Sequence, residues 1–150
     1  MDSFDKSILQ QLQQDSRIST EKLGERIGLS ASACQRRIKK LKQAGVISKE
    51  VAIIDRSKVK GLITVITEVT LEKGGEAALN EFMAQAEKEI MVQQFYYVAG
   101  EVDFIVIAVT ESMDEYDRLS RRLFMANDNI KKFTSKVAIK SYATNLSIPI

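Results

Sequence analysis

The strongest chemical signal in this sequence is a cluster of basic side chains between residues 31 and 43. The cluster contains Arg36, Arg37, Lys39, Lys40 and Lys42, and no acidic residue interrupts it. Guanidinium and ammonium groups at this density suit the phosphate backbone of a nucleic acid. A basic run is equally typical of a solvated helix surface, so its chemistry depends on the elements that hold it.

The apolar residues within the cluster predict a helix from Ala31 to Gln43. Cys34, Ile38 and Leu41 are spaced so that they share one inward face. Ser30 is a suitable N-cap, and Gly45 can adopt the left-handed conformation that closes a helix. We interpret Cys34 as a small core residue, the alternative being a redox switch. The side chains that flank or oppose the apolar face are Ser32, Arg36, Arg37, Lys39, Lys40 and Gln43.

A second, shorter helix is predicted immediately before the basic one. Ser19 or Thr20 caps its start, Leu23 and Ile27 face inward, and Gly28 turns the chain. Two short helices joined by a glycine-containing turn form the helix-turn-helix pattern, in which the second helix enters the major groove of DNA. We therefore predict that DNA is bound by Ser30, Ser32, Gln35, Arg36, Arg37, Lys39 and Lys40. Among these, Ser32, Gln35 and Arg36 are expected to reach base edges, and Lys39 and Lys40 to contact phosphates.

The first residues of the chain complete a small N-terminal domain. Phe4, Ile8 and Leu12 recur every fourth residue, which predicts an amphipathic helix that starts at Asp2 or Ser3 and ends near Asp15. After the basic helix, residues 46–47 and 51–54 are apolar and extended in pattern, and they flank the polar residues 48–50. This arrangement predicts a short hairpin, or wing. The DNA-binding domain is therefore expected to span residues 1–54.

The rest of the chain predicts a linker over residues 55–61 and a second domain over residues 62–150. Strands are expected at residues 62–71, 92–99, 104–109 and 130–142. Helices are expected around Leu79 to Ile90 and around Met113 to Leu123, the latter capped by Ser112. The order βαββαβ is the ferredoxin-like plan, an antiparallel sheet with both helices on one face. The fold class is therefore α+β, with a winged helix-turn-helix followed by a ferredoxin-like domain.

The third expected strand carries information about assembly. Residues 104–109 are apolar at every position, so both faces of the sheet are apolar at this strand. Because the two helices cover only one face, something else must cover the other, and a second copy of the domain is the simplest candidate. We predict a homodimer through the second domain.

Composition separates the two domains and excludes several classes of protein. Residues 1–60 include 13 basic and 7 acidic residues, whereas residues 61–150 include 9 basic and 13 acidic residues. The basic front is the half expected to meet nucleic acid. There is no histidine and only one cysteine, so we expect no metal site, no cofactor and no catalytic activity. No signal peptide or membrane-spanning run is apparent, and we expect a cytoplasmic, nucleoid-associated protein.

The chain as a whole resembles the Lrp/AsnC (feast/famine) family of transcription regulators. In the first domain the matching residues are Asp5, Leu9, Arg17-Ile18-Ser19, Leu23, Gly28-Leu29-Ser30, Cys34, Arg37-Ile38, Leu41 and Gly45-Val46-Ile47. In the second domain they are Val98-Ala99-Gly100 with Asp103-Phe104, which is similar to the glycine-x-x-aspartate signature of the family. The resemblance covers residues 2–148.

This resemblance implies an amino-acid-sensing second domain that dimerises, with dimers assembling into octamers around which DNA winds. The effector would bind between subunits near the glycine-x-x-aspartate loop. Carried over to this chain, its contacts would come from Tyr97, Val98, Ala99, Gly100, Glu101, Asp103, Met113, Tyr116, Ser135, Lys136 and Val137. Glu101 departs from the aspartate that commonly follows the glycine.

Two alternatives stay open for these residues. Gly100 and Asp103 are also typical of a plain turn between strands, and Met113 and Tyr116 also fit a helix core. For the protein as a whole, the alternative to an amino-acid-responsive regulator is an architectural, nucleoid-type DNA-binding protein without an effector.

Overall fold

The structure is a computed structural model that describes residues 1–55, 58–141 and 146–150. It divides into two units, one made of Met1–Ile54 with Ala143–Ile150 and the other of Asp55–Tyr142. Arg56 and Ser57 of the predicted linker, and the end of the predicted last strand at Tyr142, lie outside the described residues. Each unit has its own hydrophobic core.

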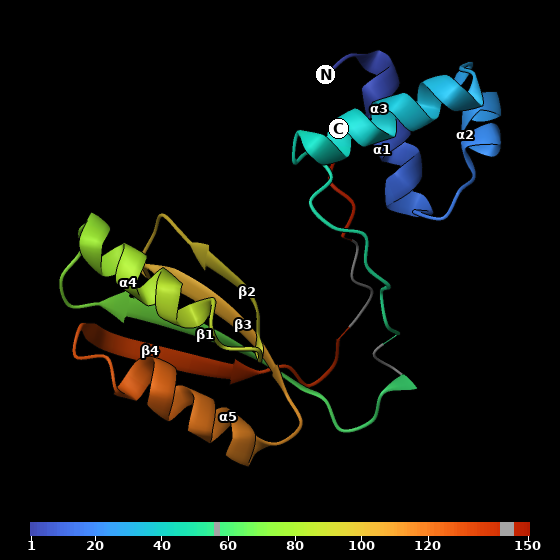
Figure 1. Ribbon diagram of the computed structural model, residues 1–150. Helices are drawn as coiled ribbons and strands as arrows, with labels where there is room; N and C mark the ends of the chain where they lie inside the picture. Colours follow the sequence, from blue (N-terminus) through green and yellow to red (C-terminus); the bar gives the residue numbers. More distant parts are fainter. Residues whose placement is uncertain (56–57, 142–145) are drawn as a thin grey trace. The chain divides into compact units, whose positions relative to one another are not determined.

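The first unit is built from three capped helices, α1 (Ser3–Gln14), α2 (Thr20–Ile27) and α3 (Ala31–Gln43) (Figure 1). The predicted caps are confirmed, because Asp2, Ser19 and Ser30 each accept a backbone N–H with their side chain. The three apolar stripes enclose one small core, whose buried residues are Ile8, Leu9, Leu23, Cys34 and Leu41. Phe4 differs from expectation, since its side chain is 39% exposed.

The predicted wing is wrong, because no strand forms between residues 44 and 55. Instead, the N–H groups of Val46 and Ile47 donate to the carbonyl of Leu41 at 3.0 and 3.3 Å, which closes the C-terminus of α3. Gly45 makes this closure possible with φ of 71°. Val51 and Ile53 are 66% and 70% exposed. Their apolar pattern therefore does not reflect pairing within the described part of this chain.

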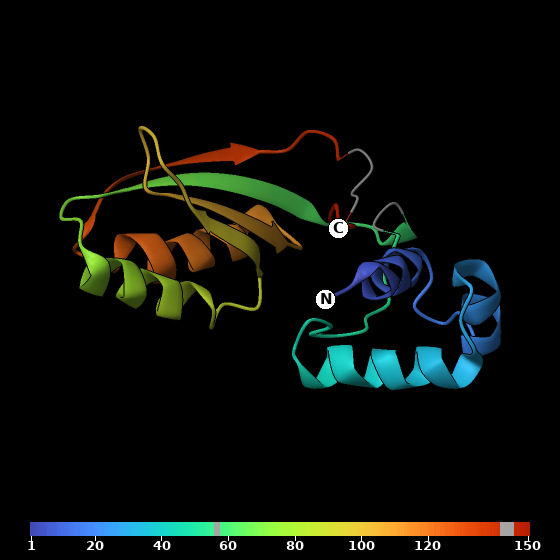
Figure 2. The same ribbon diagram turned by 90° about the horizontal axis from the view of Figure 1, so that it is seen from above.

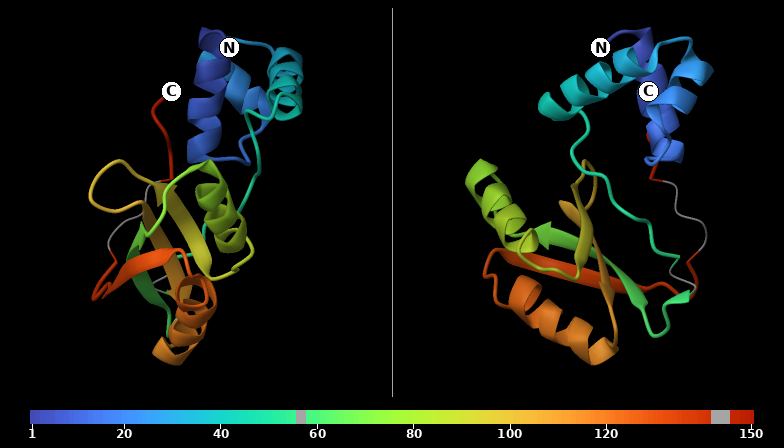
Figure 3. Two further views of the ribbon diagram at one scale, coloured as in Figure 1. Left: turned by 90° about the vertical axis from the view of Figure 1, so that its left-hand side faces the viewer. Right: turned by 45° about the vertical axis from the view of Figure 1, so that its right-hand side comes forward.

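The C-terminal segment packs on the first unit, although its sequence position assigns it to the second domain. The side-chain amide of Gln13 on α1 pairs with the backbone of Ile148, donating to its carbonyl at 3.2 Å and accepting its N–H at 2.7 Å. Gln10 donates to the carbonyl of Ile150, whose side chain packs against the helical core. Both views in Figure 3 show the C-terminus beside α1.

We expect this contact to contribute measurably to the stability of the first unit. Replacing Gln13 by alanine removes both hydrogen bonds to Ile148 and should lower the free energy of unfolding by about 0.5–1.5 kcal/mol. The matched control is Gln14→Ala, one residue further along α1, where the side chain is exposed. Urea unfolding of both variants measures the difference, and equal changes in the two would contradict a role for the Gln13 amide.

The second unit has the predicted βαββαβ order and contains one four-stranded antiparallel sheet. Its elements are β1 (Ile63–Leu71), α4 (Glu76–Ala86), β2 (Val92–Tyr97), β3 (Phe104–Thr110), α5 (Met113–Ser120), the π-helical turn η2 (Arg121–Met125) and β4 (Ile130–Val137). The strand order is β2-β3-β1-β4, and all neighbouring strands are antiparallel. Figure 2 shows α4 and α5 on the same side of the sheet.

The core of this unit lies between the sheet and its helices. Along β3, burial alternates strictly, so that Phe104, Val106 and Ala108 are buried and Ile105, Ile107 and Val109 are not. The Phe104 ring packs in a tilted arrangement against Phe82 of α4, with ring centroids 4.7 Å apart. The half-buried apolar side chains of β3 lie on the sheet face that α4 and α5 leave open.

One expectation for the second unit needs correction, and one alternative that the sequence left open is not supported. The predicted helix face included Ile90, but α4 ends at Ala86 and the Ile90 side chain is 94% exposed. Ile90 lies in the turn to β2, where the N–H of Val92 donates to the carbonyl of Glu89 at 2.9 Å. Met113 fits the apolar spacing of α5, but it is the first residue of the helix and is 47% exposed.

Within the described residues, no helix is long and apolar enough to cross a membrane.

Candidate DNA-binding surface and effector site

The connection between α2 and α3 depends on two glycines. Gly28 ends α2 in the left-handed conformation, with φ of 73°, and its N–H donates to the carbonyl of Gly24 at 2.8 Å. Gly24 itself is buried within α2, and a Cβ built on it would lie 2.3 Å from the carbonyl oxygen of Leu29. The turn between the two helices therefore passes so close to α2 that only glycine fits there.

The inward face of α3 is apolar, as its spacing predicts. Cys34 and Leu41 are buried, and Ile38 is half-buried against the same core. Burial raises the pKa of the Cys34 thiol above its usual value. The thiol stays protonated at neutral pH, and oxidation requires the thiolate, so the structure favours the interpretation of Cys34 as a core residue over a redox switch.

The outward face of α3 presents three cations that have no ion-pair partner among the described residues. Arg36, Lys39 and Lys40 are exposed, and none of them forms an ion pair among the described residues. Ser32 and Gln35 are exposed near the start of the same helix. Lys42, in contrast, pairs with Glu50 at 2.8 Å. Arg36, Lys39 and Lys40 are therefore free to meet phosphate or base edges.

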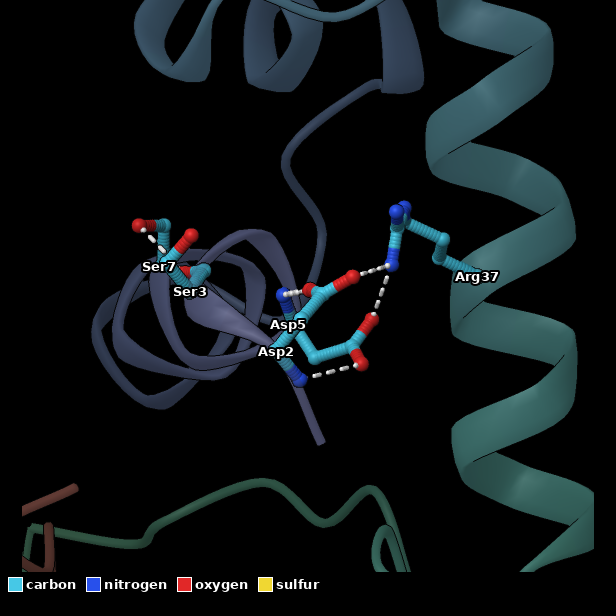
Figure 4. A network of polar contacts seen from close by, with 5 residues as sticks. All are labelled: Asp2, Ser3, Asp5, Ser7 and Arg37. Carbon is cyan, nitrogen blue, oxygen red and sulfur yellow. Dashed lines mark hydrogen bonds and ion pairs between the residues drawn. The ribbon is translucent and has the colours of Figure 1, made fainter.

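Arg37 and Ser30, also predicted to contact DNA, are both engaged within the unit. One guanidinium nitrogen of Arg37 donates to Asp2 at 2.8 Å and to Asp5 at 2.7 Å (Figure 4). The pKa of Arg37 is raised above its usual value, mainly by the hydrogen bond to Asp5 and next by the hydrogen bond to Asp2. The Ser30 side chain accepts the N–H of Ala33 as the N-cap of α3 and lies 3.2 Å from the Ser32 hydroxyl.

In the second unit, the predicted effector residues of the loop between β2 and β3 lie at one end of the sheet. The N–H of Val98 donates to the carbonyl of Asp103, and the N–H of Asp103 donates to the carbonyl of Val69, both at 2.9 Å. One carboxylate oxygen of Asp103 accepts the N–H of Leu71 at 2.7 Å. Asp103 thus joins the loop to the end of β1, whereas Gly100 is exposed with φ of 155°.

The remaining predicted effector residues lie on α5 and β4. Tyr116 is buried, and its hydroxyl forms hydrogen bonds with Thr67 and Ser135. Lys136 pairs with Glu68 across β4 and β1. Two further predicted effector residues have exposed side chains. The exposed fraction is 49% for Val137 on β4 and 61% for Tyr97 at the end of β2.

One chain does not bring the predicted effector residues of the loop between β2 and β3 together with Met113 at the start of α5. Because β1 and β3 are antiparallel, Phe104 pairs with Val69 at one end of the sheet and Thr110 pairs with Ile63 at the other. Residues 98–103 of the loop lie at the end of the sheet where Phe104 pairs with Val69. Met113 lies at the other end, where Thr110 pairs with Ile63. Of the predicted effector residues, Tyr116 and Ser135 alone are joined across elements by a hydrogen bond in the described part of the chain.

Several residues of these sites carry no signal in the sequence pattern. Gly24 resembles any helical glycine, and its close approach to Leu29 depends on the angle between two helices. Asp2 and Asp5 form a capping box in the structure, but their spacing in the sequence does not reveal that both also bind Arg37. Thr67 falls in a β-branched strand, and nothing in that strand marks its contact with Tyr116.

Fold and surface together define a helix-turn-helix DNA-binding protein with a separate ferredoxin-like domain. Comparison with known families agrees with this class. Residues 1–42 match the AsnC-type helix-turn-helix domain, and residues 64–148 match the Lrp/AsnC ligand binding domain. The chain belongs to the Lrp/AsnC family of transcriptional regulators, and it is a DNA-binding regulator with a ligand-binding domain.

Similar proteins span nearly the whole chain. An uncharacterised HTH-type transcriptional regulator of Sinorhizobium fredii is 34% identical over 150 residues, which is all of this chain and 89% of that protein. A leucine-responsive regulatory protein of Rhizobium meliloti is 31% identical over 93% of this chain and 90% of its own length. Among solved structures, an AsnC family regulator from Agrobacterium tumefaciens has a TM-score of 0.87 and 30% identity, covering 99% of this chain and 97% of that one. A transcriptional regulator of Neisseria meningitidis in complex with L-Met has a TM-score of 0.85 and 26% identity, and the match covers 99% of this chain and 96% of that one.

Proposed function

We propose that this regulator recognises specific DNA sequences by inserting α3 into the major groove. The observation that carries the proposal is the exposed face of α3, where Arg36, Lys39 and Lys40 have no acidic partner among the described residues. Ser32, Gln35 and Arg36 lie toward the start of the helix, where helix-turn-helix proteins contact base edges. Lys39 and Lys40 lie further along and are assigned to phosphates.

Two substitutions on this face should have different consequences. Arg36→Ala should lower affinity for the preferred sequence by about 1–3 kcal/mol and affect random DNA less, because a guanidinium that contacts guanine is sequence-specific. Lys39→Ala should weaken binding to all sequences alike and make the salt dependence shallower. Titration of preferred and random DNA by fluorescence anisotropy at several salt concentrations separates the two. Equal losses on both DNAs for Arg36→Ala would contradict its assigned role.

The working unit is proposed to be a homodimer formed through the open face of the sheet. On that face Ile66 pairs with Ile107, and Ile105 and Val109 extend the apolar surface along β3. A twofold dimer would present two α3 helices to a pseudo-palindromic site. Assembly of such dimers into octamers is the further proposal. Sedimentation velocity at micromolar concentration tests both, and a stable monomer would contradict the dimer.

The ligand of the second unit is proposed to be an amino acid. The matching family domain is a ligand-binding one, a similar structure holds L-Met, and similar proteins are leucine-responsive regulators. We propose a site shared between subunits, because one chain keeps the loop of Gly100 and Glu101 at the opposite end of the sheet from Met113. Exposed backbone at Gly100 would receive the ligand, and Asp103, engaged with Leu71, would hold the loop in shape.

A thermal-shift screen against the standard amino acids at millimolar concentration tests the effector. An amino acid present at 100 times its dissociation constant should add about 2.7 kcal/mol to the stability of the protein. One strong responder would support the sensing role and identify the effector class. The absence of any responder would favour the second candidate function, an architectural protein that binds DNA without an effector. In either case we propose a regulator without catalytic activity, acting on DNA in the cytoplasm.

A further inference from the structure

The first residues of α1 and the middle of α3 share a closed network of charges. Asp2 and Asp5 form a capping box, in which the N–H of Asp5 donates to Asp2 at 2.9 Å and the N–H of Asp2 donates to Asp5 at 3.1 Å. Each carboxylate uses one oxygen for this box. Its other oxygen accepts from the same Arg37 nitrogen, at 2.8 Å for Asp2 and 2.7 Å for Asp5. All four carboxylate oxygens are therefore occupied (Figure 4).

The guanidinium is fixed by more than these two hydrogen bonds. Its central carbon lies 5.6 Å from the centre of the Phe4 ring, within the range of a cation–π contact. The partly exposed Phe4 ring therefore has a partner at the surface. The Arg37 side chain is only 27% exposed, in contrast to the exposed side chains of Arg36, Lys39 and Lys40 on the same helix.

Two physical consequences follow from this geometry. First, contact between Arg37 and a phosphate would require the loss of two charge-assisted hydrogen bonds, which are among the stronger polar contacts in proteins. Second, the network ties α1 to α3 through side chains of fixed geometry, so it restricts how α3 lies on the rest of the unit. Arg37 therefore differs in kind from the other cations of α3.

We propose that Arg37 is a positioning residue that sets the orientation of the DNA-reading helix, and that Asp2 and Asp5 withhold its charge from DNA. The network makes binding more selective in two ways. It holds Gln35 and Arg36 in register with base edges, and it keeps one cation out of the sequence-independent attraction to phosphates. This inference rests on the proposed binding of DNA by α3.

The salt dependence of DNA binding provides the test. Arg37→Gln should leave the slope of log K against log salt unchanged on random DNA, and should lower the ratio of preferred to random affinity by about tenfold, the scale of one lost base contact. The matched control is Lys39→Gln, which should reduce the slope by about 0.9. If Lys39→Gln leaves the slope unchanged, the proposed use of α3 fails. If Arg37→Gln reduces the slope as Lys39→Gln does, Arg37 itself contacts phosphate, and this inference is overturned while the proposed use of α3 stands.

A second variant covers the case in which Arg37→Gln does not fold. Asp2→Asn combined with Asp5→Asn keeps side-chain oxygens for the capping box and removes both charges that hold Arg37. This double variant should bind random DNA severalfold more tightly at low salt, with a slope steeper by up to about 0.9. Adding Arg37→Gln to it should abolish the increase. A double variant with the slope and affinity of the unaltered protein would overturn the proposal.

Discussion

Replacing Gly24 by alanine should destabilise the DNA-binding unit, although the same exchange inside most helices is stabilising. Alanine ordinarily gains about 0.5–1 kcal/mol over glycine in a helix because the unfolded chain loses freedom. At Gly24 the new methyl group would lie 2.3 Å from the backbone oxygen of Leu29, and no side chain can move aside to relieve this contact. We expect a loss of about 1–3 kcal/mol, together with a displaced turn and weaker DNA binding.

Urea unfolding followed by circular dichroism and an anisotropy titration with the preferred DNA measure these two effects. The matched control is Gly74→Ala, because Gly74 has open space where a Cβ would lie and its φ is not in the left-handed region. Gly74→Ala should change the free energy of unfolding by no more than about 0.5 kcal/mol. It should leave the affinity for DNA unchanged. A Gly24→Ala protein as stable as the unaltered one would contradict the close packing of the turn on α2.

Replacing Ile107 by lysine should convert the proposed dimer into a monomer. Ile107 lies between Gln94 of β2 and Ile66 of β1 on the open face of the sheet. In a twofold dimer through this face, the substitution would place two unpaired ammonium groups in the interface, and each costs several kcal/mol to desolvate. We expect self-association to weaken at least about a thousandfold, which corresponds to about 4 kcal/mol.

Sedimentation equilibrium over a range of concentrations measures this change. Ile90→Lys is the matched control, since it makes the same exchange at a side chain that is 94% exposed and lies off the sheet. The monomeric Ile107→Lys protein should keep its far-ultraviolet circular dichroism spectrum, because this side chain is outside the core between sheet and helices. It should also bind a two-half-site DNA more weakly, having lost its second α3. A dimeric Ile107→Lys protein would place the interface elsewhere.

The local structure of this chain is predictable where side chains act on their own backbone. The sequence predicts Ser30 and Ser112 as helix caps and offers Ser19 or Thr20 as a third, and Ser19, Ser30 and Ser112 each accept the N–H three residues later. The apolar spacing of Cys34 and Leu41 likewise predicts a face that is buried. These signals depend on neighbours within one or two helical turns, which the sequence displays directly.

Interactions between distant segments account for what the sequence does not reveal. The apolar residues Val46 and Ile47 match the start of a hairpin, but their N–H groups donate to the end of α3, and the predicted strand pairs with no segment in the part of the chain that the structure describes. Arg37 looks like any other cation of its helix until α1 brings two carboxylates beside it. The effector residues are spread over both ends of one sheet, so their proposed meeting depends on a second copy of the chain.

Selection of bound sequences from a random DNA pool tests the central claim most directly. The protein is incubated with double-stranded random DNA at physiological salt, bound molecules are recovered and sequenced over several rounds, and Arg36→Ala is treated identically. We predict that the unaltered protein enriches a pseudo-palindromic motif with half-sites separated by whole helical turns, and that Arg36→Ala loses preference at a defined position in each half-site. A pool that stays random for the unaltered protein would contradict sequence-specific recognition by α3 and support the architectural alternative.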